Sequence, residues 1–253
     1  MGRQRLQLTH FVIGFSTDLF EKVWEDRDFF ISRGKRDEDG LRVLLLVPSQ
    51  DSPLSVSPAL LRQACALRDE LDSSWAARPL DLVEFRGQTG LLIEDPGGEF
   101  LDGLFGDPLA VPGFLRLAIG IVTAVGHLHE RGLIHQDIKP ANLLVNVVTG
   151  KAWLTGFGLT SRLPGPRPPL EPHALMAGTL AYMSPEQTGR MNRSIDSRSD
   201  LYSLGVTFYE MLVGAPPFTA SDPMEWVHCH IARPPPATRL NAPSNSSIAF
   251  SRP

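Results

Sequence analysis

The chain has 253 residues, of which 24 are basic and 28 acidic, so its formal net charge is −4. Hydrophobic residues make up 42% and charged residues 21%, as is ordinary for a globular protein. These values exclude a coiled coil, a disordered acidic tail and a nucleic-acid-binding protein that relies on bulk positive charge. The two cysteines suggest no disulfide framework, and no apolar run approaches the roughly 18 residues of a membrane span. We therefore expect a cytoplasmic protein.

The first part of the chain predicts short β-strands around one helix. Segments 29–31 and 43–47 are strand-like and are separated by a charged turn. Ser57-Pro58 predicts the start of a helix, whose apolar positions follow at helical spacing: Leu60, Leu61, Ala64, Leu67 and Leu71. Strand-like segments return at 80–85 and 90–94, before a break at Pro96-Gly97-Gly98.

After this break the pattern is mainly helical. A long helix is predicted over 114–130, with an apolar stripe of Leu115, Ile119, Val122, Val125 and Leu128. A hairpin follows, turning at Thr149-Gly150, and a second apolar helix spans 199–213 and ends at Gly214. Strands with one helix followed by a helical half predict an α+β chain in two lobes.

One segment carries most of the functional argument: His135-Gln136-Asp137-Ile138-Lys139-Pro140-Ala141-Asn142. It resembles the catalytic loop of serine/threonine protein kinases, His-Arg-Asp-Leu-Lys-Pro-x-Asn. Segment 178–186 resembles the end of a kinase activation segment, and segment 199–206 resembles the buried helix whose aspartate anchors the catalytic loop. The stretch 178–233 is also similar to the kinase-like domain at the N-terminus of large bacterial proteins that carry an ATPase region, a sensor region and a histidine kinase.

The resemblance covers about residues 19–233 and implies a protein-kinase-like fold with a small, mainly β N-lobe and a mainly α C-lobe. We expect an N-terminal extension over 1–18, the N-lobe over 19–96, the C-lobe over 97–233 and a disordered tail over 234–253. Several helices that complete a kinase C-lobe have no counterpart before the Pro-rich tail, so the C-lobe is predicted to be incomplete. The chain is then either a piece of a larger protein or a naturally shortened one.

The resemblance also implies a reaction and a site. An active member would transfer the γ-phosphoryl group of ATP, with Mg²⁺, to a Ser or Thr hydroxyl of a protein. Asp137 would be the base, Lys139 would stabilise the phosphoryl group and Asn142 would bind the metal ion. Residues implied to support the site are His135, Phe157, Thr179, Glu186 and Asp200. Glu94 and Pro96 would lie at the hinge that contacts the adenine.

Four features depart from what ATP handling requires. Gly156 stands where the Asp-Phe-Gly motif has its metal-binding aspartate, and glycine offers no ligand. Leu46 stands at the position of the strand lysine, and Ala64 lies near that of its glutamate partner. The acidic turn 25–28 replaces the Gly-rich loop, and its carboxylates would repel a triphosphate. Pro96 has no N–H group to offer to adenine.

These departures leave the function open between two classes. The chain is either a serine/threonine protein kinase of a signalling pathway or a catalytically inactive pseudokinase that serves as a signalling or protein-interaction module. The departures favour the pseudokinase, and a non-functional fragment is a third possibility. In each functional class the partner is a protein, either a separate one or an adjacent domain of the same chain. Gln136 stands where many kinases have an arginine, which predicts no activation by phosphorylation of the activation segment.

Overall fold

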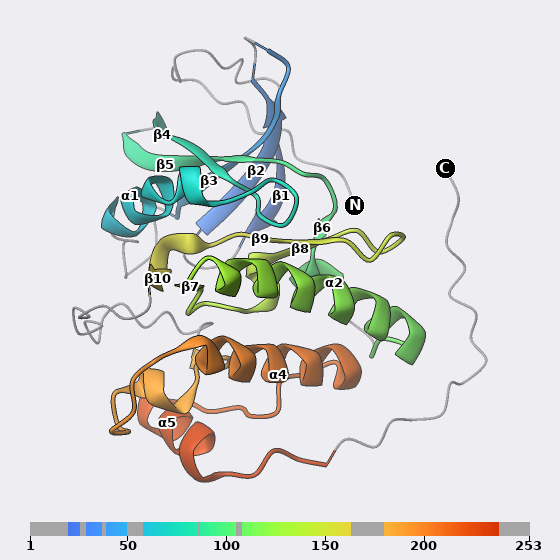
Figure 1. The fold of residues 1–253 in the computed structure, drawn as a ribbon, viewed down its shortest axis with the longest axis vertical. Coiled ribbons are helices and arrows are strands. Elements are labelled where there is room, and N and C mark those ends of the chain that lie inside the picture. Colours follow the sequence, from blue (N-terminus) through green and yellow to red (C-terminus); the bar gives the residue numbers. More distant parts are fainter. Residues whose placement is uncertain are drawn as a thin grey trace.

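A five-stranded antiparallel sheet forms the upper lobe of the protein, shown in blue to teal in Figure 1. The computed structural model describes residues 20–25, 29–36, 39–49, 58–85, 87–104, 108–162 and 180–237. The sheet has the order β1-β2-β3-β5-β4, with β1 at Glu21–Glu25, β2 at Phe29–Lys35, β3 at Arg42–Pro48, β4 at Pro79–Phe85 and β5 at Gln88–Glu94. The predicted strands are thus present, and β1 extends the sheet at one edge.

Strand β3 lies in the middle of the sheet and buries side chains on both of its faces. Val43, Leu45 and Val47 contribute to a small cluster with Phe85, while Leu44 belongs to the main core. Successive residues of a strand point to opposite faces, so a continuous apolar run suits a strand that is covered on both sides.

Helix α1, Pro58–Ala66, packs beside this sheet and faces the lower lobe. Its buried residues are Leu61 and Ala64. The predicted helix continues to Leu71, but the structure has a short 3-10 helix at Arg68–Glu70 in place of its last turn. The helix start is placed at Pro58 as predicted, and Ser57 lies outside the described residues.

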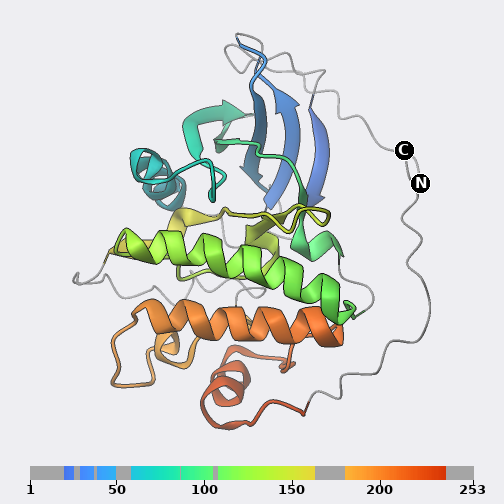
Figure 2. The ribbon, with the colours of Figure 1, turned by 45° about the vertical axis from the view of Figure 1, so that its right-hand side comes forward.

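Two long helices dominate the lower lobe and lie side by side in both ribbon views (Figures 1 and 2). They are α2, Val111–Glu130, and α4, Ser197–Val213. Helix α4 begins at Asp196, whose carboxylate accepts a hydrogen bond from the backbone N–H of Arg198, and it ends at Gly214 in the left-handed conformation. Both boundaries follow the signals that the sequence contains.

A third helix, α5 at Pro223–Ala232, lies below α4 and is not among the predicted elements. Its start signal is present in the sequence, because Asp222 caps the helix and Pro223 follows at its first position. Short strands lie between the upper sheet and these helices: β6 at Glu99–Phe100, β7 at Leu133–Ile134, β8 at Leu143–Val145, β9 at Ala152–Leu154 and β10 at Ser161–Arg162. Strands β8 and β9 form the predicted hairpin.

The buried face of α2 differs from the predicted stripe. Val125 and Leu128 are buried, but Leu115, Ile119 and Val122 are 51%, 69% and 47% exposed. The remaining buried positions are Leu117, Ala118, Ile121 and Ala124. Apolar residues occupy more than one side of this helix, so periodicity alone does not identify the side that packs on the core.

Helix α2 also has the length and composition of a membrane span, with a mean hydropathy of 1.6. The expectation that no apolar segment approaches a span is therefore wrong for this helix. The observation is weak evidence for a membrane, because the core helix of a globular protein meets the same criterion. In the structure α2 packs against α4 and β9.

The α+β class and the division into a sheet-rich N-lobe and a helical C-lobe are confirmed. The four domain boundaries stay predictions. Most of the two predicted terminal segments, 1–18 and 234–253, lies outside the described residues.

Candidate functional site

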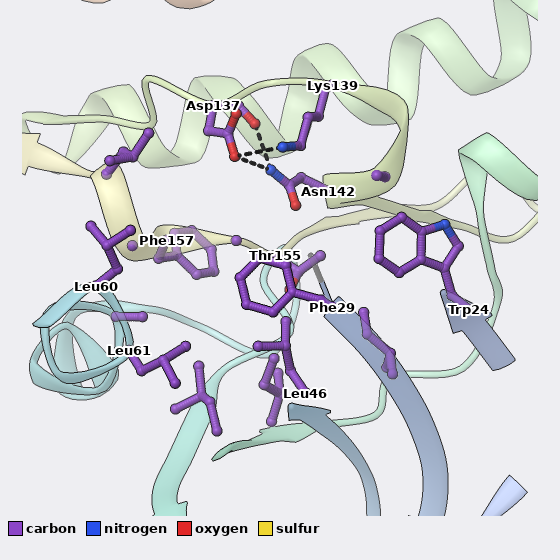
Figure 3. Close-up of a pocket in the computed structure, with 18 residues that line it drawn as sticks. Trp24, Phe29, Leu46, Leu60, Leu61, Asp137, Lys139, Asn142, Thr155 and Phe157 are labelled. Atoms are coloured by element: carbon purple, nitrogen blue, oxygen red, sulfur yellow. Dashed lines mark hydrogen bonds and ion pairs between the residues drawn. The ribbon is translucent and has the colours of Figure 1, made fainter. Parts of the chain in front are cut away.

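Three side chains of the loop between β7 and β8 meet at the boundary between the lobes (Figure 3). One Asp137 oxygen, Oδ2, lies 3.1 Å from Nζ of Lys139 and accepts a hydrogen bond of 2.8 Å from Nδ2 of Asn142. The same amide donates to the backbone carbonyl of Asp137 at 2.7 Å. The structure therefore brings together the three residues predicted as catalytic, while their roles stay predictions.

A buried aspartate of α4 fixes the backbone of this loop. Asp200 is fully buried, and its two carboxylate oxygens accept hydrogen bonds from the backbone N–H groups of His135, at 2.9 Å, and Gln136, at 2.8 Å. The ring of His129 in α2 lies 2.8 Å from the same carboxylate. The placement of Asp200 agrees with the anchoring role that the resemblance implies.

The buried, neutral ring of His135 joins the backbone of the loop to that of Thr155 by hydrogen bonds. Its Nε2 lies 2.8 Å from the carbonyl oxygen of Thr155, which can only accept, so Nε2 carries the proton. Its Nδ1 then accepts from the backbone N–H of Asp137 at 3.2 Å. Desolvation lowers the pKa of His135 more than the nearby carboxylates raise it. The ring also packs against Phe157, at 5.2 Å between ring centroids.

Gly156 and Asn142 occupy the region where a kinase would hold its metal ion. Gly156 has φ 78° and ψ 37°, and a Cβ atom placed on it would lie 2.5 Å from Oδ1 of Asn142. The asparagine amide therefore fills the space that an aspartate side chain at this position would need. With its amide nitrogen directed at Asp137 and no carboxylate at 156, the described residues do not fit a magnesium ion here.

The pocket between this loop and the five-stranded sheet is walled mainly by apolar side chains, which surround a common space in Figure 3. They include Trp24, Phe29, Ile31, Leu46, Leu91 and Ile93. Leu46 and Ala64, which the resemblance aligns with the lysine and its glutamate partner, both line the pocket. Among the described lining residues the charged ones are Asp137 and Lys139, which pair with each other. The described part of the pocket thus offers no unpaired cation to a triphosphate.

Trp24 belongs to the pocket wall and is a residue that the sequence analysis did not identify. It lines the pocket from β1, and its Nε1 donates to Oδ2 of Asp102 in the lower lobe at 3.0 Å. Its ring lies 6.1 Å from that of Phe100. Its place in the wall depends on the register of β1 with β2, which shifts between Lys22 and Trp24, so alternation along β1 does not predict it. Residues 26–28 of the acidic turn lie outside the described residues.

The segment that links the lobes carries a buried ionic cluster that the sequence analysis did not identify. The side chain of Asp95 is fully buried and lies 2.9 Å from Nε of Arg33 in β2 and 3.0 Å from a guanidinium nitrogen of Arg42 in β3. Glu94 and Pro96, the predicted hinge contacts, are not among the residues that line the pocket. No sequence pattern connects Asp95 with two arginines more than 50 residues away.

Glu186, another predicted support residue, is not among the residues that line the pocket. It accepts a hydrogen bond from the hydroxyl of Ser199. Its neighbour Gln187 donates to the backbone carbonyl of Gln136 at 2.8 Å and so joins this segment to the loop. Gln136, at φ 67°, donates to the carbonyl of Leu159. Thr179 lies outside the described residues.

Comparison with known proteins identifies the family whose catalytic loop segment 135–142 resembles. Residues 114–249, just over half of the chain, match the family model described as protein kinase domain. The chain is 37% identical over 112 residues to serine/threonine-protein kinase PknB of Mycobacterium tuberculosis, which covers 44% of this chain and 17% of the relative. It is 35% identical over 125 residues to a probable PknB of Bifidobacterium longum, covering 48% and 18%. For PknB of Mycolicibacterium smegmatis the identity is 32% over 136 residues, covering 53% and 21%. The matches thus span about a fifth of the length of these curated relatives.

Proposed function

Since the chain belongs to the protein kinase domain family, we propose that it is a pseudokinase: a serine/threonine-kinase-like domain that keeps the fold and the loop of an enzyme but does not use MgATP. The function proposed is a signalling or protein-interaction module. Its partners would be a separate protein or adjacent domains of a longer, bacterial and cytoplasmic chain.

The observation that carries this proposal is that the two charged side chains among the described pocket residues pair with each other. Lys139, the one basic side chain among the described lining residues, lies 3.1 Å from Asp137. A triphosphate carries several negative charges, and binding it beside an already neutralised lysine leaves most of that charge without a partner. Kinases rely on added lysine and metal charge at this place, and Leu46 and Gly156 supply neither.

A second candidate, an active phosphotransferase, has one observation in its favour. Oδ1 of Asp137 is buried and has no hydrogen-bond partner among the described residues. An unpaired carboxylate oxygen at this position is suited to accept the proton of a hydroxyl group. The same feature also fits a pocket that binds an uncharged hydrogen-bond donor, so it supports phosphotransfer less strongly than the missing lysine and metal ligand oppose it.

The deciding experiment is a thermal melt of the protein with and without millimolar ATP, each with and without Mg²⁺. A ligand at 100 times its Kd stabilises a folded protein by about 2.7 kcal/mol, which is a shift of several degrees for a domain of this size. We expect no shift in a cooperative melt.

A Mg²⁺-dependent shift would contradict the proposal. Phosphotransfer to a generic protein substrate would then be measured on wild type and Asp137→Asn. Activity that is lost in Asp137→Asn would establish the enzyme, and partner binding that persists in this variant would be the signature of the module.

A further inference from the structure

The proposed function does not explain the chemical character of the pocket between the lobes. Its described wall is mainly apolar, and beneath that wall Oδ1 of Asp137 is a buried side-chain acceptor with no hydrogen-bond partner among the described residues. We propose that this pocket binds an uncharged, mainly apolar ligand that carries one hydrogen-bond donor, such as a small phenol or a hydroxylated aromatic compound. This inference rests on the proposed function, because it requires that a nucleotide does not occupy the pocket.

The apolar wall determines the body of the ligand. The upper lobe contributes Trp24 and Phe29, Leu46 comes from β3, and Leu60 and Leu61 come from α1 (Figure 3). Two aromatic rings and several branched aliphatic side chains favour a planar apolar group, because such a group buries apolar surface and can stack against the rings.

The orientation of Trp24 is fixed before any ligand arrives. Its indole nitrogen donates to Asp102, and its ring packs near Phe100. A wall residue that is already held in place loses little conformational entropy when a ligand binds, so it favours binding of a rigid ring.

The acceptor determines the polar end of the ligand. Oδ2 of Asp137 is already bonded to Asn142 and lies beside Lys139, whereas Oδ1 has no described partner. A buried acceptor without a partner is costly, and a hydroxyl or N–H group of a ligand would satisfy it once a small rotation of the Asp137 side chain brings Oδ1 to the pocket surface. An anion would meet this carboxylate unfavourably, and Lys139 already balances its charge, so a neutral donor fits better than a cation.

Three naphthalene derivatives test each part of the inference by calorimetric titration and thermal melts. 2-Naphthol has the apolar body and a donor, 2-methoxynaphthalene has the same body without a donor, and 2-naphthyl phosphate adds negative charge. We expect 2-naphthol to bind and to raise the melting temperature. The methoxy compound should bind at least tenfold more weakly, and the phosphate should give no detectable binding.

Two matched variants locate the site. Leu46→Trp places a large side chain in the pocket, whereas Leu82→Trp makes the same change at a half-buried position of β4 that does not line it. We expect 2-naphthol to bind wild type and Leu82→Trp but not Leu46→Trp. Equal binding by all three proteins would overturn the assignment of the pocket. The comparison of the three ligands on wild type remains decisive even if Leu46→Trp does not fold.

The possible failures are distinguishable. A cooperative melt that is unchanged by both MgATP and 2-naphthol refutes the ligand class and leaves the pseudokinase proposal intact. Stabilisation by MgATP refutes the pseudokinase proposal itself. Binding of 2-naphthyl phosphate as tight as that of 2-naphthol shows that the pocket accepts anions, which refutes the requirement for an uncharged ligand.

Discussion

Replacement of Gly156 by alanine tests whether Asn142 fills the space of the absent metal ligand. The residue has φ 78°, where a side chain costs about 1 kcal/mol relative to glycine. The new Cβ would lie 2.5 Å from the amide of Asn142, which must move and give up its bonds to Asp137. A hydrogen bond to a charged group contributes about 1.5–3 kcal/mol, and we take the low end because Asn142 borders the pocket. The expected loss in the free energy of unfolding is therefore about 2.5 kcal/mol.

Urea denaturation at pH 7.5 measures this loss, and Gly189→Ala is the matched control. Gly189 has φ 69°, and a Cβ atom added to it would meet no other atom within 4 Å, so its replacement isolates the backbone cost of about 1 kcal/mol. In a background of Asn142→Ala the change at 156 should also cost only about 1 kcal/mol, because the steric conflict has been removed. Equal losses for Gly156→Ala and Gly189→Ala in the wild-type background would refute the reasoning.

Three further outcomes follow from single contacts. Burial lowers the pKa of His135, so the histidine of the unfolded chain is protonated first as the pH falls below about 6.5. The free energy of unfolding should therefore decrease with falling pH, by at most about 1.4 kcal/mol per pH unit. Urea melts at pH 7.5 and pH 5.5 that coincide would contradict this expectation. Loss of a helix cap in Asp196→Ala or Asp222→Ala should each lower stability by about 1 kcal/mol, and an unchanged urea midpoint in both would show that the caps are not formed. Tyr182→Phe removes a 2.6 Å bond to the buried carboxylate of Glu210 and should lower stability by about 1–3 kcal/mol, which a thermal melt with no shift would disprove.

The local parts of the fold were predictable because their signals are contained in a few neighbouring residues. Gly214 ends α4 in the left-handed conformation that glycine tolerates, and the hairpin turns where the sequence predicts it. The catalytic loop was predictable for a similar reason, since Asp137, Lys139 and Asn142 lie within one turn-rich segment. Their spacing in sequence determines most of their spacing in space.

The parts that could not be predicted depend on contacts between distant segments. Helix α2 is apolar on more than one side, and only the positions of α4 and β9 decide that Ile121 is buried while Ile119 is exposed. The sequence does not show that the Asn142 amide fills the space of an aspartate side chain at position 156, because this depends on the distance between the two residues. Trp24 enters the pocket wall through the register of β1 with β2, which the sequence of β1 alone does not contain.

The buried cluster around Asp95 has a mechanical consequence for the whole molecule. Arg33 binds Asp95 and also donates to the carbonyl of Gly98 at 2.8 Å, so the segment after β5 is held to the upper sheet. At Gly98 the same segment lies close to β8 of the lower lobe. A Cβ atom added to Gly98 would lie 2.5 Å from the carbonyl oxygen of Val145. Because this connection is bonded to the upper lobe and in contact with the lower one, we expect the lobes to rock less than they would about an unbonded linker. The contacts around Asp95 therefore limit how far the pocket between the lobes can open.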